Sequence, residues 1–432
     1  MREIIKVRKV NSILQKSTDK IKYSIRHINN EVGWHQHLQS KKIGIVATSI
    51  ALKFLNRMEN EISEQDKAYN FIVNSQNPDG GWAYISNLPD NSNTESTCWA
   101  LSALNIHREQ YSEQIEKGKT WLLSKINMDL SDDSGWGFVG ISNPRIYNTC
   151  LVLRTLSELN INSCEEYESG LNWLKTCQNR DGGWGEIKGS QSGLFYTSYV
   201  IVTLIKCGTN PNDNVILNAI KWLEQNIYQY GMDSPSSICT IEFIEEDIND
   251  KKSRTPFFHF TIPHIIQAFI ISNNNTKRIV FDGILQLLES NCDGYWRHPF
   301  LEQSQLIPIW AIYDSIEAFL DFKEKNTDWE KIHHFRVWMN IIVKIRTYNP
   351  MRIWDKINPK LISFIITVLV IVLTILYFPK IKNIIPADKN KEYIDFGLSV
   401  LSSIIASIII YIMIYLINPI FRNIRNKKKL KA

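Results

Sequence analysis

One pattern, Gln-Asn-x-Asp-Gly-Gly-Trp, occurs twice in this chain and constrains its fold more than any other feature. It ends at Trp82 in "SQNPDGGWAY" and at Trp184 in "CQNRDGGWGE". Related turns in "EVGWHQH", "DSGWGF" and "CDGYWRH" place further tryptophans at 34, 136 and 296, so that the first steps are 48, 54 and 48 residues. The last gap, 112 residues, leaves room for one weaker copy in "YQYGMD". This regular spacing indicates six copies of one repeated unit.

Each unit has the same internal order. An amphipathic stretch such as "GLNWLKTCQ" precedes the turn, and a more uniformly apolar stretch such as "FYTSYVIVTLIKC" follows it. A helix that is apolar on one side belongs at a surface, whereas a helix that is apolar all round must be buried. Neither helix can bury its apolar surface alone, so the pairs must stack. The sequence therefore predicts an all-α fold, an (α/α)6 toroid of six helical pairs that closes without capping repeats.

The residues of the repeated turn are predicted to hold the fold together. Adjacent glycines allow a helix to end and the chain to turn sharply, and Asp79 and Asp181 are placed to bond backbone groups of that turn. The tryptophan is expected to cover the helix end, and the glutamine to bond backbone groups left open there. The structural residues are Gln76, Gly81, Trp82, Trp136, Gln178, Gly183, Trp184 and Trp296.

Two uncharged apolar runs near the end of the sequence are long enough to cross a bilayer. They are residues 361–378 and 396–417, and at about 1.5 Å per residue each spans a hydrocarbon core of about 30 Å or nearly so. Lys and Arg number five in 344–360 and six after the second run, against four between the runs. This asymmetry predicts a membrane protein whose N-terminal domain and C-terminal tail are cytoplasmic.

The predicted domain organisation follows from these features. It comprises an α/α toroid at 1–348, a basic juxtamembrane linker at 349–360, transmembrane helices at 361–378 and 396–417 joined by a short external loop at 379–395, and a basic tail at 418–432. The stretch "SSICTIEFIEEDINDKKSR" (236–254) interrupts the repeat, and its charges indicate a solvated loop, with a lid or partner surface as the alternative.

The two complete turns resemble the Gln-Trp repeats of squalene–hopene cyclases and related class II terpene cyclases. Those enzymes share their toroid with protein prenyltransferase β subunits, and the resemblance covers roughly residues 20–345. It implies the fold and, less specifically, an isoprenoid ligand.

The resemblance also implies a catalytic position. Class II cyclases carry an Asp-x-Asp-Asp-Thr motif whose middle Asp protonates an alkene or epoxide. The matching register here is "NTEST", so that Asn93 and Ser96 replace the outer acids and Glu95 replaces the middle one. An acid that must keep its proton at neutral pH needs flanking acids and an apolar wall around it. Glu95 is thus the candidate catalytic acid, with an ordinary acidic residue in the first turn of a helix as the alternative.

Other chemistry has less support in the sequence. "DLSDD" at 129–133 lies before Trp136 and is interpreted as a turn. The zinc ligands of protein prenyltransferases, an Asp-x-Cys and a distant His, are not matched on an inner helix, so no metal or cofactor is expected. The seven cysteines lack paired spacing and are expected to be reduced, several of them buried. The net charge of +5 is concentrated near the C-terminus, which argues against nucleic-acid binding.

Polar and aromatic residues gather where the inner helices are expected to begin. Arg and His there are suited to an anionic head group, and the aromatic residues to an apolar tail or a cationic intermediate. The predicted substrate-binding residues are Arg145, Tyr147, Tyr196, Arg254, His259, Arg297 and His298, with His35, His37, His264 and Glu302 in the same group.

Two functional interpretations follow. The first is a membrane-anchored, terpene-cyclase-like or prenyltransferase-like protein that binds, and cyclises or transfers, an isoprenoid lipid. The second is a non-catalytic toroid that senses a ligand or a protein and is coupled to a two-span membrane effector or anchor. Possible partners are a lipid, the membrane, another protein or a second copy of the chain.

Overall fold

A computed structural model describes residues 7–84, 92–127, 134–139, 142–230, 241–246, 252–257, 259–275, 277–297 and 305–325. The two predicted transmembrane runs lie outside these residues, as do "DLSDD", Cys239, His298 and Glu302. Within the described residues, no helix is both long and apolar enough to cross a membrane.

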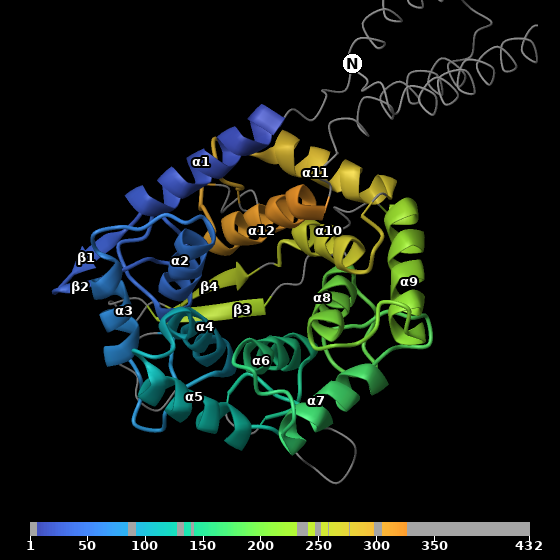
Figure 1. Cartoon of the computed structure of the whole chain (residues 1–432), viewed down its shortest axis with the longest axis horizontal. Helices are drawn as coiled ribbons and strands as arrows, with labels where there is room; N and C mark the ends of the chain where they lie inside the picture. Colours follow the sequence, from blue (N-terminus) through green and yellow to red (C-terminus); the bar gives the residue numbers. More distant parts are fainter. Residues whose placement is uncertain are drawn as a thin grey trace, which may run out of the picture. The chain divides into compact units, whose positions relative to one another are not determined.

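The helices of the described residues alternate between an outer and an inner ring (Figure 1). The outer ring consists of α1 (Val7–Tyr23), α3 (Gln65–Asn74), α5 (Ser112–Ser124), α7 (Glu165–Thr176), α9 (Asn214–Tyr230) and α11 (Arg278–Ser290). The inner ring consists of α2 (Ile45–Arg57), α4 (Thr94–Leu104), α6 (Ile146–Glu158), α8 (Leu194–Lys206), α10 (Thr261–Ile271) and α12 (Ile309–Lys325). A short 3-10 helix, η1 (Asn105–His107), follows α4.

Burial explains this alternation. Along α8 every residue from Leu194 to Leu204 is buried, whereas α7 buries only one side. Each inner helix packs against the next, and α12 returns to pack against α2, which closes the ring. The predicted helical toroid is confirmed, and α1 adds the outer helix of the first pair, which the sequence patterns did not single out.

The same backbone hydrogen bond recurs between successive pairs and closes the ring. The first residue of an inner helix donates its N–H to the carbonyl two residues after the next tryptophan, as in Thr94 to Phe138 (3.0 Å) and Ile146 to Glu186 (3.1 Å). Ile309, in the last pair, donates in the same way to Gln36 of the first pair at 2.9 Å. Closure therefore uses the contact that joins neighbouring pairs elsewhere, so no end of the stack is left open.

The tryptophans of the turns make equivalent contacts. The indole Nε1 of Trp82 donates to Ile72 O at 2.7 Å, and that of Trp184 donates to Leu174 O at 2.9 Å, each near the end of the preceding outer helix. The backbone N–H of each of these tryptophans donates to a threonine on the following inner helix, at 3.0 Å in both cases. Trp34, Trp136 and Trp296 are also buried, with indoles bonded to carbonyls of their preceding helices.

The aspartates of the complete turns link neighbouring pairs. Asp79 accepts hydrogen bonds from Gly81 N (3.0 Å), from Ser92 Oγ (2.7 Å) and from the indole of Trp121 on the next outer helix (2.8 Å). Asp181 repeats this set with Gly183, Ser192 and Trp222. Their role here is structural, as the sequence predicts.

Two details of the turn differ from the prediction. Only the first glycine of each pair, Gly80 (φ +94°) or Gly182 (φ +96°), has a left-handed backbone. Gly81 is needed for close packing instead, because a Cβ there would lie 2.7 Å from Ser92 Cβ and 2.8 Å from the Trp121 ring. Gln76 donates to Gly80 O and also to Gln114 O, in the first turn of the next outer helix, both at 2.9 Å. The glutamine therefore bridges two pairs rather than only capping its own helix.

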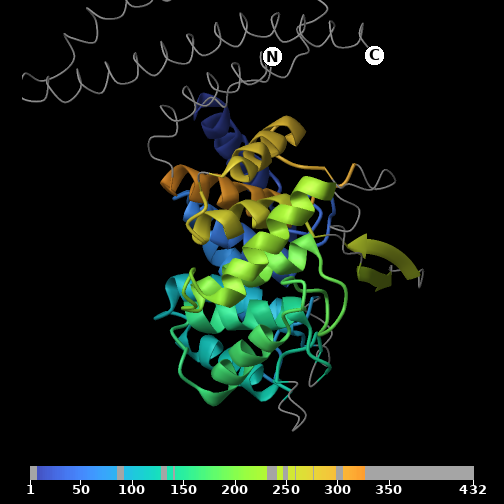
Figure 2. The same ribbon diagram turned by 90° about the vertical axis from the view of Figure 1, so that its right-hand side faces the viewer.

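Two antiparallel hairpins accompany the helices. β1 (Arg26–Ile28) pairs with β2 (Glu31–Gly33) beside the first pair. β3 (Ile241–Glu246) pairs with β4 (Lys252–Phe257) and lies at one opening of the ring (Figures 1 and 2). β3 and the first three residues of β4 lie within 236–254, where a loop was predicted, so that prediction is wrong for residues 241–246 and 252–254.

Candidate functional site

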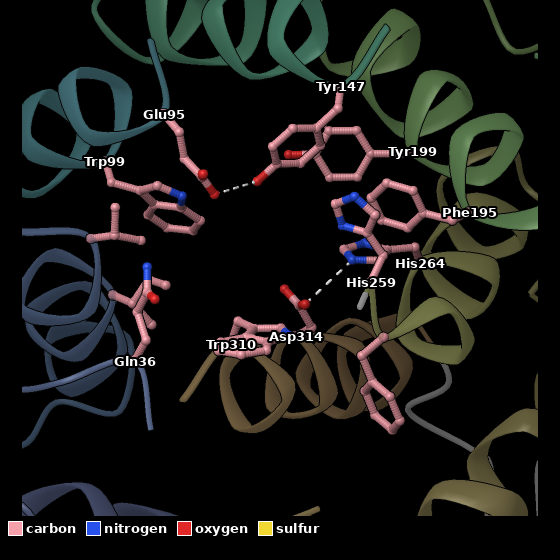
Figure 3. Close-up of a pocket in the computed structure, with 13 residues that line it drawn as sticks. Gln36, Glu95, Trp99, Tyr147, Phe195, Tyr199, His259, His264, Trp310 and Asp314 are labelled. Atoms are coloured by element: carbon pink, nitrogen blue, oxygen red, sulfur yellow. Dashed lines mark hydrogen bonds and ion pairs between the residues drawn. The ribbon is translucent and has the colours of Figure 1, made fainter. Parts of the chain in front are cut away.

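A cavity that is partly open to solvent lies inside the inner ring, and the space between its lining residues, open solvent included, is about 510 Å³. Its lining comes from every inner helix and from the segments just before α2 and α10 (Figure 3). The lining residues are Gln36, Val46, Ile50, Glu95, Trp99, Tyr147, Phe195, Tyr199, His259, Phe260, His264, Trp310 and Asp314.

Most of these residues occupy equivalent positions in the repeat. The second residue of five inner helices faces the cavity: Val46, Glu95, Tyr147, Phe195 and Trp310. The sixth residue of four of them adds a second layer, one helical turn further along: Ile50, Trp99, Tyr199 and Asp314. The cavity is therefore a product of the repeat, and each helix contributes its own chemistry at the same two positions.

Glu95 is the acidic residue of the first layer and is bonded by two tyrosines. Its Oε2 accepts a hydrogen bond from the Tyr84 hydroxyl, and its Oε1 accepts one from the Tyr147 hydroxyl at 3.0 Å. The side chain is buried, with a relative exposure of 9% for the residue. Burial raises the pKa of Glu95, while the two hydroxyl donors act in the opposite direction because they stabilise the carboxylate.

The neighbours of Glu95 in the sequence hold the helix start and do not face the cavity. Asn93 caps α4 by accepting from Ser96 N at 2.9 Å, and Thr94 Oγ1 donates to Gly137 O at 2.7 Å. Thr97 Oγ1 accepts from Trp82 N. Glu95 therefore lacks the flanking acids that the resemblance implies, and Tyr84 and Tyr147 surround its carboxyl group instead.

Aromatic rings form much of the opposite wall. His259 stacks on Phe195 with ring centroids 3.7 Å apart and an angle of 6° between the planes, and it lies 4.9 Å from the Tyr147 ring. Burial, and then the charge of His264, lower the pKa of His259 to about 3. The imidazole of His259 is therefore neutral at physiological pH and behaves as part of the aromatic wall.

A second titratable pair lines the same cavity. His264 Nε2 on α10 lies 3.3 Å from Asp314 Oδ2 on α12, and their side chains are 8% and 16% exposed. The His264 ring meets those of Phe195 and Tyr199 nearly at right angles, each at 5.2 Å. Packing and the contact with Asp314 together fix the orientation of this imidazole.

Polar contacts join the C-terminal parts of the inner helices. Glu158 accepts from Lys53 at 2.9 Å and from Ser102 at 2.7 Å, and Gln267 donates to Asp321 at 2.8 Å. Arg154 lies over the Tyr199 ring, 5.0 Å from its centroid. The first and second layers of the lining are therefore largely aromatic, and charged side chains lie beyond them, toward the C-terminal ends of the inner helices.

The predicted site residues divide into two sets. Glu95, Tyr147, His259 and His264 line the cavity, whereas Tyr196 is buried behind it against Phe195. Arg145 forms an ion pair with Glu186 and does not line the cavity. Arg297 is exposed in the turn after Trp296, and Arg254 lies on β4. Among the described residues, therefore, the expected cluster of arginines around the ligand does not line this cavity.

Sequence reasoning missed Tyr84, Trp99, Phe195, Tyr199, Trp310 and Asp314. Alignment of the inner helices on their first residues would have found all but Tyr84, because the cavity uses the second and sixth positions. Tyr84 follows Trp82 by two residues and carried no separate signal. No group of three or more potential metal ligands is assembled within the ranges that the structure describes.

The comparison with known families gives a match that covers more than half of the 432 residues. The prenyltransferase α/α-toroid domain matches residues 14–233. Solved structures with a similar fold include three enzymes. A variant of the type II terpene cyclase MstE from Scytonema, in complex with its substrate geranylgeranyl dihydroxybenzoate, shares 12% identity over 74% of this chain and 98% of its own, with a TM-score of 0.49.

The other two structures are enzymes with different activities. An ent-copalyl diphosphate synthase from Streptomyces platensis shares 15% identity over 53% of this chain and 44% of its own, with a TM-score of 0.39. An α-amylase from Clostridium perfringens shares 11% identity over 72% of this chain and 97% of its own, with a TM-score of 0.49. Likeness at this level carries no argument about activity. On the strength of its domain match, the chain belongs to the prenyltransferase α/α-toroid domain family.

Proposed function

We propose that the toroid binds an isoprenoid chain in its central cavity and that Glu95 starts the cyclisation of this chain by protonating a terminal double bond. The observation that carries the proposal is the position of the Glu95 carboxyl group, buried at the cavity wall between the hydroxyls of Tyr84 and Tyr147. The family fold is consistent with isoprenoid binding or cyclisation.

The surroundings of Glu95 suit a proton donor. An alkene is a very weak base, so the acid must hold its proton until the alkene is in place, and burial favours that neutral form. After proton transfer the carboxylate is left in the cavity, and there the two tyrosine hydroxyls supply hydrogen bonds to it. Together these effects can substitute for the acids that Asn93 and Ser96 replace.

The aromatic wall suits the intermediate that protonation creates. Protonation of a trisubstituted alkene gives a tertiary carbocation, and aromatic faces attract cations by roughly 0.5–2 kcal/mol each. Trp99, Phe195 and Trp310 line the cavity and provide such faces. The same rings bury the apolar chain of the substrate.

We further propose that residues 361–378 and 396–417 anchor the toroid to a membrane, with the toroid and the C-terminal tail on the cytoplasmic side. Two spans would keep the cavity close to a substrate dissolved in the bilayer. Attachment of an epitope to the C-terminus, followed by protease protection in intact and permeabilised spheroplasts, tests this topology. The tail should be protected from the protease in intact spheroplasts and cleaved once they are permeabilised. Cleavage of the tail in intact spheroplasts would contradict the proposed topology.

A second function, a non-catalytic ligand or protein sensor coupled to the membrane segments, has one specific observation in its favour. Asn93 and Ser96 stand where the outer acids of the cyclase motif would be. A sensor needs the cavity but not the acid. The sensor function therefore predicts that the ligand is retained chemically unchanged, and that replacement of Glu95 does not reduce this retention.

One experiment separates the two functions. The full-length protein is extracted in mild detergent, its bound lipid is identified by mass spectrometry, and a neutral polyprenyl alcohol or a prenylated aromatic compound is then added. We expect the wild type to form a cyclic isomer of the substrate and Glu95→Gln to lose at least about 100-fold in rate, with lipid retention preserved. Glu113→Gln, at an exposed residue of α5, is the matched control. Retention of lipid without conversion in the wild type would favour the sensor.

A further inference from the structure

The cavity contains a second titratable pair on the wall facing Glu95. His264 and Asp314 project from α10 and α12, and Figure 3 shows them across the open cavity from Glu95 on α4. Their Nε2–Oδ2 distance is 3.3 Å, and both side chains are largely shielded from solvent. A mechanism confined to Glu95 and the aromatic rings leaves this pair without a role.

Proton balance requires a proton acceptor at the end of the reaction if the proposed function holds. The O–H bond of the Glu95 carboxyl breaks, its proton forms a C–H bond with the terminal alkene carbon, and the π electrons of that alkene supply the new bond. Internal alkenes then form C–C bonds as the positive charge moves along the chain. The last cation becomes neutral when a neighbouring C–H bond breaks, its electrons form a new C=C bond, and a base takes the proton.

We propose that His264 is this base and that Asp314 is its positioning residue, an inference that rests on the proposed function of Glu95. With Nε2–H donated to Asp314, Nδ1 carries the lone pair that accepts the proton. The imidazolium that forms is then stabilised by the carboxylate of Asp314. Substrate and product are isomers, so the cycle needs no oxidant and no second substrate; before the next turnover His264 gives its proton to solvent and Glu95 takes one from solvent.

Other groups of the cavity fit this role less well. His259 stacks flat on Phe195 at 3.7 Å and lies in a site that disfavours its charged form. Tyr147 is committed to Glu95 through its hydroxyl. Of these candidates, only the imidazole of His264 is paired with a carboxylate that can compensate its positive charge.

The position of the pair also has a consequence for the path of the charge. Glu95 belongs to the first layer of the lining, and Asp314 occupies the second layer, one helical turn deeper. The rings of Phe195 and Tyr199 flank His264. The chain would therefore be protonated at the outer layer, and the positive charge would move past these rings toward the carboxylate of Asp314, which attracts it.

The test compares the full-length wild type with His264→Phe, which keeps an aromatic ring but removes the base, using a neutral polyprenyl alcohol in detergent. We expect wild-type protein to give one predominant cyclic alkene. The His264→Phe variant should consume substrate at a rate within about tenfold of wild type but release other alkene isomers or a water-captured alcohol, with the normal alkene reduced at least tenfold. His27→Phe, at an exposed position of β1, is the matched control.

Asp314→Asn provides a second variant in case His264→Phe does not fold. A positioning role predicts that Asp314→Asn shifts the product spectrum in the same direction as His264→Phe while it consumes substrate at a rate within about tenfold of wild type, whereas a merely structural role would lower the melting temperature and leave the product spectrum of the folded fraction unchanged. An identical product spectrum and rate in His264→Phe would overturn the inference and leave Glu95 untouched. Equal turnover by wild type and Glu95→Gln, or no turnover by wild type, would instead remove the proposed function and this inference with it.

Discussion

The hydroxyl of Tyr147 lies 3.0 Å from Oε1 of Glu95, although 52 residues separate them in the sequence. The two occupy the second positions of neighbouring inner helices, α6 and α4, so the repeat itself brings them together. Tyr84 approaches the other carboxyl oxygen from the turn before α4. In this three-residue arrangement the cavity wall carries a buried acid, and two tyrosine hydroxyls are already in place to donate hydrogen bonds to its carboxylate form.

Removal of one hydroxyl should slow the reaction without emptying the cavity. We expect Tyr147→Phe to lower kcat by roughly 10- to 100-fold, because the Glu95 carboxylate would lose a donor in a site of low polarity. Substrate binding should change little, since the ring remains. Steady-state kinetics on the purified protein measures both quantities, and Tyr196→Phe, whose ring lies behind the cavity wall, serves as the control. Equal losses in the two variants would argue against a specific role for Tyr147.

The raised pKa of Glu95 makes stability depend on pH in a defined direction. A carboxyl group whose pKa is higher in the folded than in the unfolded state favours folding below its unfolded pKa, and this contribution is lost as pH rises through the folded pKa. The melting temperature of Glu95→Gln, relative to wild type, should therefore rise between pH 5 and pH 9. Thermal unfolding across this range checks the sign.

The control for this prediction is Glu113, which lies on the surface. A hydrogen bond from Lys117 lowers the pKa of Glu113, so the contribution of Glu113 to stability changes only at more acidic pH, and Glu113→Gln should show a flat difference between pH 5 and pH 9. A flat difference for Glu95→Gln would mean that its carboxyl group is not held in the neutral form.

His259 should make the fold sensitive to acid. Its pKa is lowered to about 3 by burial and by the charge of His264, whereas an unfolded histidine titrates near 6.5. Between these values the unfolded chain binds a proton that the folded chain does not, so stability falls as pH decreases. We expect His259→Phe to gain roughly 3 kcal/mol over wild type at pH 4 and far less at pH 8. Chemical denaturation at both pH values tests this, with His27→Phe expected to show no such gain.

The aspartates of the repeated turns should contribute to stability and not to chemistry. Asp79→Ala removes the acceptor for Gly81 N, Ser92 Oγ and the Trp121 indole, and should cost roughly 2–4 kcal/mol in unfolding free energy. Asp282→Ala, at a partly exposed residue paired with Arg278, should cost less than about 1 kcal/mol. Loss of activity by folded Asp79→Ala would contradict a purely structural role.

Much of the fold could be predicted from the sequence because the repeat is written in residues with strict geometric demands. Tryptophan, aspartate and glycine recur at fixed spacing, and the inner helices are apolar along their whole length. The hairpin β3–β4 was missed because its strands, "IEFIEE" and "KSRTPF", are rich in charged residues and do not sustain the alternation of apolar and polar residues that marks a strand. The contribution of α1 was missed because no complete turn of the "DGGW" kind follows it.

The site was predicted only in part, for a physical reason. Glu95 could be found from its register with a known motif, but of the groups that tune it Tyr147 comes from the next unit of the repeat, and no sequence pattern marks Tyr84 in the preceding turn. Charge alone was misleading: Arg145 is neutralised by Glu186, and the walls of the cavity are aromatic and acidic rather than basic. Side-chain contacts between neighbouring units decide such matters, and the linear sequence does not display them.

The most direct measurement is the conversion of a neutral polyprenyl alcohol by the full-length protein in D2O, with the product analysed by mass spectrometry. The exchangeable proton of Glu95 becomes a deuteron in D2O. Its transfer to the terminal alkene should give a cyclic product with one deuterium, on the alkene carbon that Glu95 protonates. Glu95→Gln should give none above background. A cyclic product without deuterium, or equal labelled product from wild type and Glu95→Gln, would contradict the role of Glu95 as the acid that starts the reaction.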